Sequence, residues 1–459
     1  MVLGLLKSYV DVFSPKKEVK FSHKKENRKS TFSEILESSV PEFKAGSSYW
    51  SNLLLPSGHL QTAYSSLAKF EGEDQVCYKR RIINIDLKNR HYFIEGQKLN
   101  YDQWDGQSTV AIDYVTSPQQ ISGEPEKFRP ESQEQGKLPL RTEYLDPAEE
   151  QLLLQDENKP LVIALHGLTG GSYENYIRSF FKKITEEPFN FDALVLNSRG
   201  CAGHTLTSPQ LFCGIWTNDI RYLINEHIRP NWPNKRIYLI GFSLGGAVLA
   251  NYLAQEGDDL YENIKFASVL GTPWNFENSM SKLHSNILGN YVYSPTLCSN
   301  LISLTEKHAE GHLQAHRVVQ NFKANKNDLN LTKVNDFDEY FTSNMFGFNN
   351  VYEYYRMASP IQRLYKVRVP LLILDSLDDP ITGSSLPHGD LKSNPFLTMV
   401  TTTMGGHLGW FKSDGTRWYV NPLCQLYYTI DQWLLDRSDI LLSDLPRDIT
   451  LMRKLDRIV

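Results

Sequence analysis

Residues 236–246 have the sequence RIYLIGFSLGG, and this stretch decides the fold. Arg236–Ile240 is an apolar run typical of a buried parallel strand, and Ala247–Leu253 (AVLANYL) continues as a helix. Between them lies a G-x-S-x-G sequence centred on Ser243. At a strand-to-helix turn, this pattern predicts a strained serine whose hydroxyl projects at the helix N-terminus, where backbone N–H groups can stabilise an oxyanion. A simple glycine turn is the alternative interpretation.

Further apolar runs on both sides of this stretch indicate an α/β fold. Because helical sequence separates most of them, they predict βαβ units and a mostly parallel central sheet covered by helices. The expected strands are Cys77–Asp86, Thr109–Tyr114, Leu161–Leu165, Ala193–Leu196, Arg236–Ile240, Ala267–Leu270, Leu371–Leu374 and Leu397–Thr403.

Two segments interrupt the alternation of strands and helices. Val115–Pro139 is rich in Gln, Glu, Ser and Pro, which predicts a polar surface insertion near 115–139, with disorder as one interpretation. Thr272–Ile361 is rich in Asn, His, Phe and Tyr and looks mostly helical. We expect it to form a mainly helical cap near 275–357.

A serine nucleophile needs a base, and the base needs a carboxylate that orients it. In the α/β-hydrolase chain order, the acid and then the histidine follow the serine. His407 lies in GGHLG just after a late strand, and Asp379 precedes Pro380 in the loop after Leu371–Leu374. The predicted catalytic residues are therefore Ser243, Asp379 and His407. Asp378 and Asp375 remain alternatives for the acid. The structural interpretation of an aspartate at these positions is a turn residue or a helix cap.

The loop after the Leu161–Leu165 strand has the sequence HGLTGGS, residues 166–172, in the H-G-x-x-G-G style of esterases. The backbone N–H groups of Leu168 and Leu244 are the candidates for an oxyanion hole. The alternative for this loop is a glycine turn that joins strand to helix.

Several motifs occur together in one order: GHLQT (58–62), HGLTGGS (166–172), NSRGC (197–201), WTNDIR (216–221), GFSLGG (241–246), DDP (378–380) and GGHLGW (405–410). This set resembles the fungal group of medium-chain fatty-acid ethyl-ester synthase/esterases and monoacylglycerol lipases in the AB hydrolase superfamily. The resemblance runs from about Tyr49 to about Trp433. It implies a serine hydrolase that acts on medium-chain acyl esters and passes the acyl group to water or an alcohol, without metal or organic cofactor. A catalytically silent fold used for binding or regulation is the alternative.

The composition excludes several other classes of protein. With 459 residues, 41% hydrophobic residues and 22% charged residues, the chain is typical of a soluble globular protein. A net charge of −5 gives no global basic surface for nucleic acid. Five cysteines without a C-x-x-C pair favour a reducing compartment, and no apolar run is long enough to span a membrane. We therefore expect an intracellular, cytoplasmic enzyme.

Residues 1–48 differ from the rest of the chain in composition and charge. We therefore expect residues 49–459 to form the hydrolase domain. Met1–Phe13 is mostly apolar, and Met1–Ser30 carries a net charge of +5, mainly from Lys16–Lys29. This pattern fits a solvated terminal tail, and it also fits peripheral contact with a membrane or lipid droplet.

Three further features have a structural and a functional interpretation. His308, His312 and His316 recur at i, i+4 and i+8, but no H-E-x-x-H is present, which favours cap packing or solvent over zinc. Arg199 is expected to pair with a carboxylate rather than with substrate. The aromatic cluster Phe337–Tyr355 is expected to form the core of the cap or to line an acyl pocket.

Overall fold

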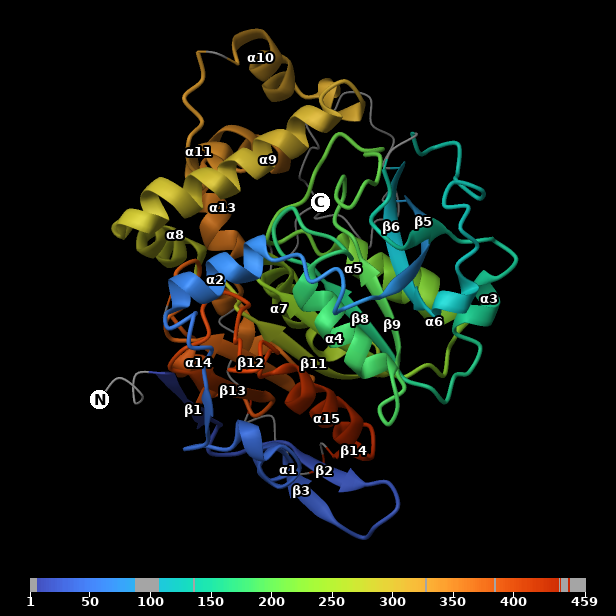
Figure 1. The fold of residues 1–459 in the computed structure, drawn as a ribbon, viewed down its shortest axis with the longest axis vertical. Helices are drawn as coiled ribbons and strands as arrows, with labels where there is room; N and C mark the ends of the chain where they lie inside the picture. Colours follow the sequence, from blue (N-terminus) through green and yellow to red (C-terminus); the bar gives the residue numbers. More distant parts are fainter. Residues whose placement is uncertain are drawn as a thin grey trace.

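The computed structural model describes residues 6–86, 107–134, 137–326, 328–383, 385–436, 438 and 445. An 11-stranded sheet runs through the molecule (Figure 1). In spatial order, its strands are β4 (Ser48–Trp50), β1 (Lys7–Phe13), β13 (Leu397–Thr402), β12 (Leu371–Ser376), β11 (Ile264–Leu270), β10 (Ile237–Phe242), β8 (Leu161–Leu165), β9 (Asp192–Leu196), β6 (Gln107–Thr116), β5 (Cys77–Asp86) and β7 (Thr142–Tyr144).

The parallel part of the sheet runs from β13 through β12, β11, β10 and β8 to β9. Every residue of β8, β10, β12 and β13 is buried, which explains why β8, β10 and the first four residues of β12 are continuous apolar runs instead of alternating ones. All of the predicted strands are present, with boundaries that differ by a few residues. The predicted α/β fold with a mostly parallel central sheet is confirmed.

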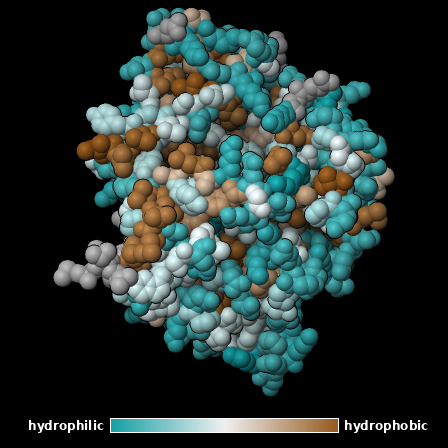
Figure 2. Space-filling model, in the orientation of Figure 1, coloured by the Kyte–Doolittle hydropathy of each residue, from teal (hydrophilic) through white to brown (hydrophobic). Residues whose placement is uncertain are grey.

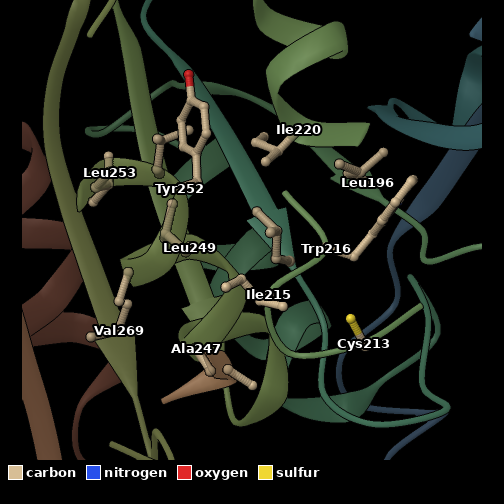
Figure 3. Close-up of a cluster of buried hydrophobic side chains, with 14 of the residues drawn as sticks. Leu196, Cys213, Ile215, Trp216, Ile220, Ala247, Leu249, Tyr252, Leu253 and Val269 are labelled. Atoms are coloured by element: carbon tan, nitrogen blue, oxygen red, sulfur yellow. The ribbon is translucent and has the colours of Figure 1, made fainter. Parts of the chain in front are cut away.

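Helices cover both faces of this sheet. On one face, α1 (Phe32–Ser39), α4 (Asn175–Thr185) and α15 (Val420–Ile430) pack around a core of Phe and Tyr side chains. On the other face lie α5 (Asn218–Tyr222), α6 (Arg229–Asn231) and α7 (Leu244–Glu256). Figure 3 shows part of that second core, which includes Ile215 and Ile220 together with Leu249 and Leu253 of α7. Short helices α2 (Gly58–Leu67), α3 (Glu150–Leu153) and α14 (His388–Leu391) lie outside these layers.

The segment between β11 and β12 forms a helical cap over one end of the sheet (Figure 1). Phe337, Phe341 and Tyr355 are buried within it. Its helices are α8 (Phe276–Ser285), α9 (Ser294–His308), α10 (Arg317–Asn325), α11 (Val334–Phe337), α12 (Ser343–Phe346) and α13 (Val351–Ala358), with one-turn π-helical segments at 289–293 and 338–342. Among the described residues, no helix is both long and apolar enough to cross a bilayer.

The prediction of a solvated N-terminal tail is wrong for residues 6–30. Strand β1 pairs antiparallel with β13, with Val10 opposite Thr402, and it pairs with β4 on its other side. Strands β2 (Lys20–His23) and β3 (Lys29–Thr31) form a separate three-stranded sheet with β14 (Trp433–Asp436). The alternation of Lys7–Phe13, which buries Ser8 and Val10, is the signal for this strand. Residues 1–5 lie outside the described ranges.

The polar insertion near 115–139 is folded against the sheet in its described part. Phe128 and Leu138 pack on the small buried cluster that includes Tyr144. The Ser122 backbone N–H and hydroxyl both donate to the Glu143 carboxylate, at 2.9 Å each. A few apolar side chains and one buried carboxylate thus hold a segment whose composition alone suggested disorder.

Candidate active site

Ser243 occupies the turn between β10 and α7. Its φ of 53° and ψ of −121° place a non-glycine residue in a strained region, as expected for a nucleophile elbow. Its backbone N–H donates to the Leu270 carbonyl at 2.9 Å, which fixes the turn to β11. A Cβ at Gly245 would lie only 2.4 Å from the Leu165 carbonyl oxygen, so no larger residue fits there. The glycine of the motif therefore lets the elbow approach β8.

His407 lies between Ser243 and Asp379. The Ser243 hydroxyl is 2.9 Å from His407 Nε2, and His407 Nδ1 is 2.8 Å from Asp379 Oδ2. Because a carboxylate accepts at Nδ1, that nitrogen carries the proton and Nε2 is free to accept from the serine. The structure brings these three predicted residues together, although they come from three separate loops.

Asp379 is buried, and its environment favours the ionised form. Burial acts to raise the pKa of this carboxyl, but His407 and two backbone donors outweigh it and hold the pKa below its usual value. The donors are the N–H groups of Ile381 and Thr382, at 2.7 and 3.0 Å from Oδ1. Asp379 is therefore suited to stabilise an imidazolium.

The two alternative carboxylates have other partners. Asp378 Oδ1 accepts from the backbone N–H groups of Gly405 and Gly406, at 2.9 and 2.8 Å, and so holds the loop that carries His407. Asp375 accepts from Trp274 Nε1 at 2.8 Å, and burial, together with the nearby charge of Asp379, raises its pKa to about 7. Among the three aspartates, Asp379 is the one that contacts the imidazole.

Helix α2 supplies a support for the histidine that sequence reasoning missed. The His407 backbone N–H donates to Thr62 Oγ1 at 2.8 Å, and the Thr62 hydroxyl donates to the Gly58 carbonyl at 2.6 Å. Gln61 accepts from the Phe411 N–H at 2.8 Å in the same loop. The GHLQT motif is thus part of the site, but nothing in its spacing links it to a histidine 345 residues away.

Leu168 and Leu244, the residues of the two predicted oxyanion donors, line the same cavity as Ser243. Neither the Leu168 nor the Leu244 backbone N–H donates a hydrogen bond to another residue in the part of the chain that the structure describes. A Cβ at Gly167 would lie 3.3 Å from the Ser243 Cβ, which shows how closely the loop after β8 approaches the elbow. His166 holds that loop, because its Nδ1 contacts the Gly167 carbonyl and its Nε2 accepts from the Ser198 N–H.

A cavity of about 770 Å³ lies between the sheet end, α2 and the cap. Its cap wall combines apolar side chains, such as Leu301 and Phe337, with polar ones, such as Asn300. Its other wall includes hydroxyl and carboxyl groups from α2 and from the loop after β8, among them Ser66 and Glu174. Ser243 and His407 also line the cavity.

Comparison with known proteins assigns the family. The profile of the alpha/beta hydrolase fold matches residues 160–411, more than half of the chain. The chain belongs to the alpha/beta hydrolase family. It is 37% identical to a monoacylglycerol lipase of Saccharomyces cerevisiae over 407 residues, which covers 87% of this chain and 84% of that protein. It is 30% identical to medium-chain fatty acid ethyl ester synthase/esterase 2 of the same yeast, over 89% of this chain and 92% of that protein.

Among solved structures, an esterase of Pyrococcus furiosus aligns with a TM-score of 0.40 and 11% identity, over 78% of this chain and 94% of that one. With its curated relatives, the family membership shows that the hydrolase is an enzyme of the serine esterase and lipase class.

The remaining sequence candidates of the hydrolase are structural. Arg199 is fully buried and pairs with Asp219 at 2.7 Å, as predicted. The three histidines do not share one helical face, because α9 ends at His308 and a 3₁₀ turn follows. His308 Nε2 contacts the Gly200 carbonyl at 2.9 Å, which ties the cap to the sheet. No cluster of potential metal ligands is present among the described residues.

The aromatic cluster Phe337–Tyr355 contributes to the cap core, as predicted, and also lines the cavity. Phe341 is buried within the cap, and its ring centroid lies 4.8 Å from that of Phe337. Phe337, Tyr354 and Tyr355 also line the cavity. The same side chains therefore form the cap core on one side and the cavity wall on the other.

Proposed function

We propose that the chain hydrolyses medium-chain acyl esters, including monoacylglycerols and ethyl esters, through Ser243, Asp379 and His407. The names of the two yeast relatives supply the substrate class. The observation that carries the mechanism is the position of His407, within hydrogen-bond distance of both Ser243 and Asp379. The size of the cavity and the apolar side chains of its cap wall suit an acyl chain.

In this mechanism, Ser243 Oγ attacks the ester carbonyl while His407 Nε2 takes its proton. The carbonyl oxygen becomes an oxyanion, which the N–H groups of Leu168 and Leu244 stabilise. His407 then gives the proton to the leaving alcohol, and an acyl-enzyme remains on Ser243. Water or a second alcohol, activated by His407, releases the acyl group as an acid or a new ester. Asp379 keeps the imidazole in the required tautomer throughout.

Ser243→Ala tests this proposal directly. We expect the variant to fold normally and to lose ester hydrolysis by at least about 10³-fold. A fluorophosphonate probe should label the wild-type chain but not this variant. Ser303→Ala, which changes a serine of the same cavity on the cap, should keep the labelling. Normal turnover by folded Ser243→Ala would contradict the mechanism, and absence of both labelling and turnover in the wild type would favour the catalytically silent alternative.

Acyl transfer to an alcohol is a separate part of the proposal. Measuring free acid against ethyl ester, from a medium-chain thioester or glycerol ester in buffer with graded ethanol, gives the partition of the acyl-enzyme. We expect the ester product to rise with ethanol at a constant rate of acylation. Free acid as the sole product at every ethanol concentration would restrict the enzyme to hydrolysis.

We also propose that the cavity mouth contacts a lipid surface. Exposed apolar side chains lie on both sides of it, and Leu54, Leu67 and Ile287 are 84%, 79% and 78% exposed. Figure 2 shows hydrophobic residues gathered on this side of the molecule, over α2 and the turn between α8 and α9. We call this surface the apolar rim; it comprises Leu53, Leu54, Leu60, Leu67, Ile287, Leu288, Tyr291 and Val292.

Two observations connect the apolar rim with lipid. Leu67 and Val292 belong both to the rim and to the lining of the cavity, so the apolar rim is continuous with the cavity that contains Ser243. The two halves of the rim are held together by a 3.0 Å hydrogen bond between His59 and Tyr293. Exposed apolar patches of this kind mark interaction sites.

Glutamate at Leu54 and Ile287 tests the apolar rim. We expect the double variant to lose at least about tenfold in binding to phosphatidylcholine vesicles, because two apolar groups no longer enter the lipid. Its turnover of a soluble short-chain ester should stay the same. Leu152→Glu, at a 59% exposed leucine on α3, is the matched control. Charge reversal at Lys16 and Lys25 tests the basic N-terminal segment separately. Unchanged vesicle binding by the rim variant would remove the rim from the proposal.

A further inference from the structure

We propose that Glu174 binds the hydroxyl groups of the alcohol part of the substrate, so that this part of the cavity selects esters of a polyol such as glycerol. This inference rests on the proposed ester hydrolysis at Ser243. It assigns a specificity-determining residue outside the three catalytic ones.

The backbone places Glu174 beside the predicted oxyanion hole. Glu174 directly precedes α4, at the position where a side chain often caps a helix, but its side chain makes no capping hydrogen bond. It turns back toward the loop after β8 instead. Its Oε1 lies 2.9 Å from where a Cβ would stand on Gly170, two residues beyond Leu168. Glu174 lines the same cavity as Ser243 and His407.

The carboxyl group of Glu174 has no partner within the described part of the protein. No hydrogen bond or ion pair joins its oxygens to another described residue, although two arginines lie near it. Arg178 is committed to backbone carbonyls, including those of Tyr173 and Asp74. Arg417 donates to the Asn175 side chain, and its guanidinium lies over the Phe411 ring. The hydrogen-bonding capacity of Glu174 therefore faces the cavity.

Glu174 is half-buried, and its place in the cavity wall makes it available to hydrogen-bonding groups of a bound molecule. Burial raises the pKa of Glu174 to about 7, with the two arginines acting in the opposite direction. At neutral pH both the protonated and the ionised forms are populated. A hydroxyl group can donate to the ionised form and accept from the protonated one, so it suits both, whereas a cationic head group would suit only the ionised form.

The surroundings of Glu174 also fit a polyol. Thr169 on the loop after β8 and Ser65 and Ser66 on α2 line the cavity together with Glu174, and the cap wall contributes aliphatic and aromatic side chains beside polar ones. An ester held with its carbonyl at Ser243 and its acyl chain under the cap would direct its alcohol part toward these polar groups. Ethanol has no further hydroxyl to offer them, and glycerol has two.

The test compares two substrates with the same acyl chain, a 1-monoacylglycerol and the ethyl ester. Glu174→Ala should lower kcat/KM for the monoacylglycerol by about 10- to 50-fold and change it for the ethyl ester by less than about threefold. Glu174→Gln keeps an acceptor and a donor and should retain most of the selectivity. Glu186→Ala, at an exposed glutamate just after α4, should leave both substrates unchanged. Thermal unfolding of each variant verifies that it is folded.

Equal losses on the two esters would overturn the inference, because Glu174 would then support the loop in general. If Glu174→Ala does not fold, Glu174→Met decides, since it keeps the length of the side chain but removes its hydrogen bonding, and a polyol site then predicts a fall in the ratio of kcat/KM for the monoacylglycerol to kcat/KM for the ethyl ester without loss of stability. An acylcholine of the same chain length provides a third substrate. Selective loss on that ester would show that Glu174 binds a cation and would likewise overturn the polyol assignment. Absence of wild-type activity on all three esters would instead contradict the proposed function.

Discussion

The catalytic loops and the cap form two walls of one cavity, but they are held in different ways. In the loops at 375–382 and 403–410, single directional hydrogen bonds fix each group, such as the two from Gly405 and Gly406 to Asp378. The cap is held mainly by aromatic packing, such as that of Phe341 against Phe337 and Phe322. Hydrogen bonds set the positions of individual atoms. Apolar packing stabilises a buried core, but it has little directional preference and does not fix single atoms in the same way. Substitutions in the loops should therefore affect rate, and those in the cap should affect stability.

The largest expected effect distinguishes two adjacent loop residues. Asp379→Asn should lower kcat by about 10⁴-fold, because the imidazole loses its charge partner and adopts the wrong tautomer. Asp378→Asn should cost only about tenfold, because it weakens the support of the loop without removing the partner of the imidazole. Steady-state kinetics on a soluble ester measures both. Similar losses would show that loop position matters as much as the carboxylate itself.

The ionisation of a buried carboxyl in the cap should affect the stability of the protein rather than the rate of the reaction. Burial raises the pKa of Asp338 to about 6, although Thr342 and Tyr355 donate to it. Since the folded state holds this proton more tightly than the unfolded state, stability is complete below about pH 4 and declines as the pH rises through about 6. Asp338→Asn should remove up to about 3 kcal/mol of this decline. Urea unfolding between pH 4 and 8 measures it, and parallel curves for variant and wild type would contradict the assignment.

Thr62 provides a smaller test of the directional hydrogen bonds. Thr62→Val keeps the shape of the side chain but leaves the His407 N–H without an acceptor. We expect about a tenfold lower kcat at nearly the same stability. Thr62→Ser keeps the hydroxyl and should be close to wild type. If both substitutions behave alike, the methyl contact of Thr62 matters more than its hydrogen bond.

The smallest effect is expected inside the cap. Phe341→Leu replaces a fully buried ring by a smaller apolar group and should lower the free energy of unfolding by about 1 kcal/mol. Turnover of a short-chain ester should change by less than about twofold, because Phe341 does not line the cavity among the described residues. Chemical unfolding and initial rates measure the two quantities. A tenfold loss of rate would show that cap packing and catalytic geometry are coupled.

The sequence predicted well wherever physical chemistry acts locally along the chain. Buried parallel strands such as β8 and β10 are apolar along most of their length, and the elbow needs glycine close to Ser243. Predictions from the sequence failed where a strand pairs with a strand that is distant along the chain. Strand β1 is a short alternating segment whose partner, β13, lies about 390 residues away, so a basic, partly apolar terminus resembled a tail. The same applies to β2 and β3, which pair with β14.

The sequence by itself determined the fold class, the serine elbow and the order of candidate acid and histidine, because each depends on residues that are neighbours in the chain. The choice among Asp375, Asp378 and Asp379 was decided only by the tertiary structure. All three lie within five residues, at the end of β12 and in the loop after it. One carboxylate reaches His407, while the others are occupied by Trp274 and by Gly405 and Gly406. Thr62 and Glu174 likewise gain their roles only when α2, the loop after β8 and the histidine loop meet around the cavity. Hydrogen bonding depends on distances of about 3 Å between atoms, and only the folded chain sets those distances.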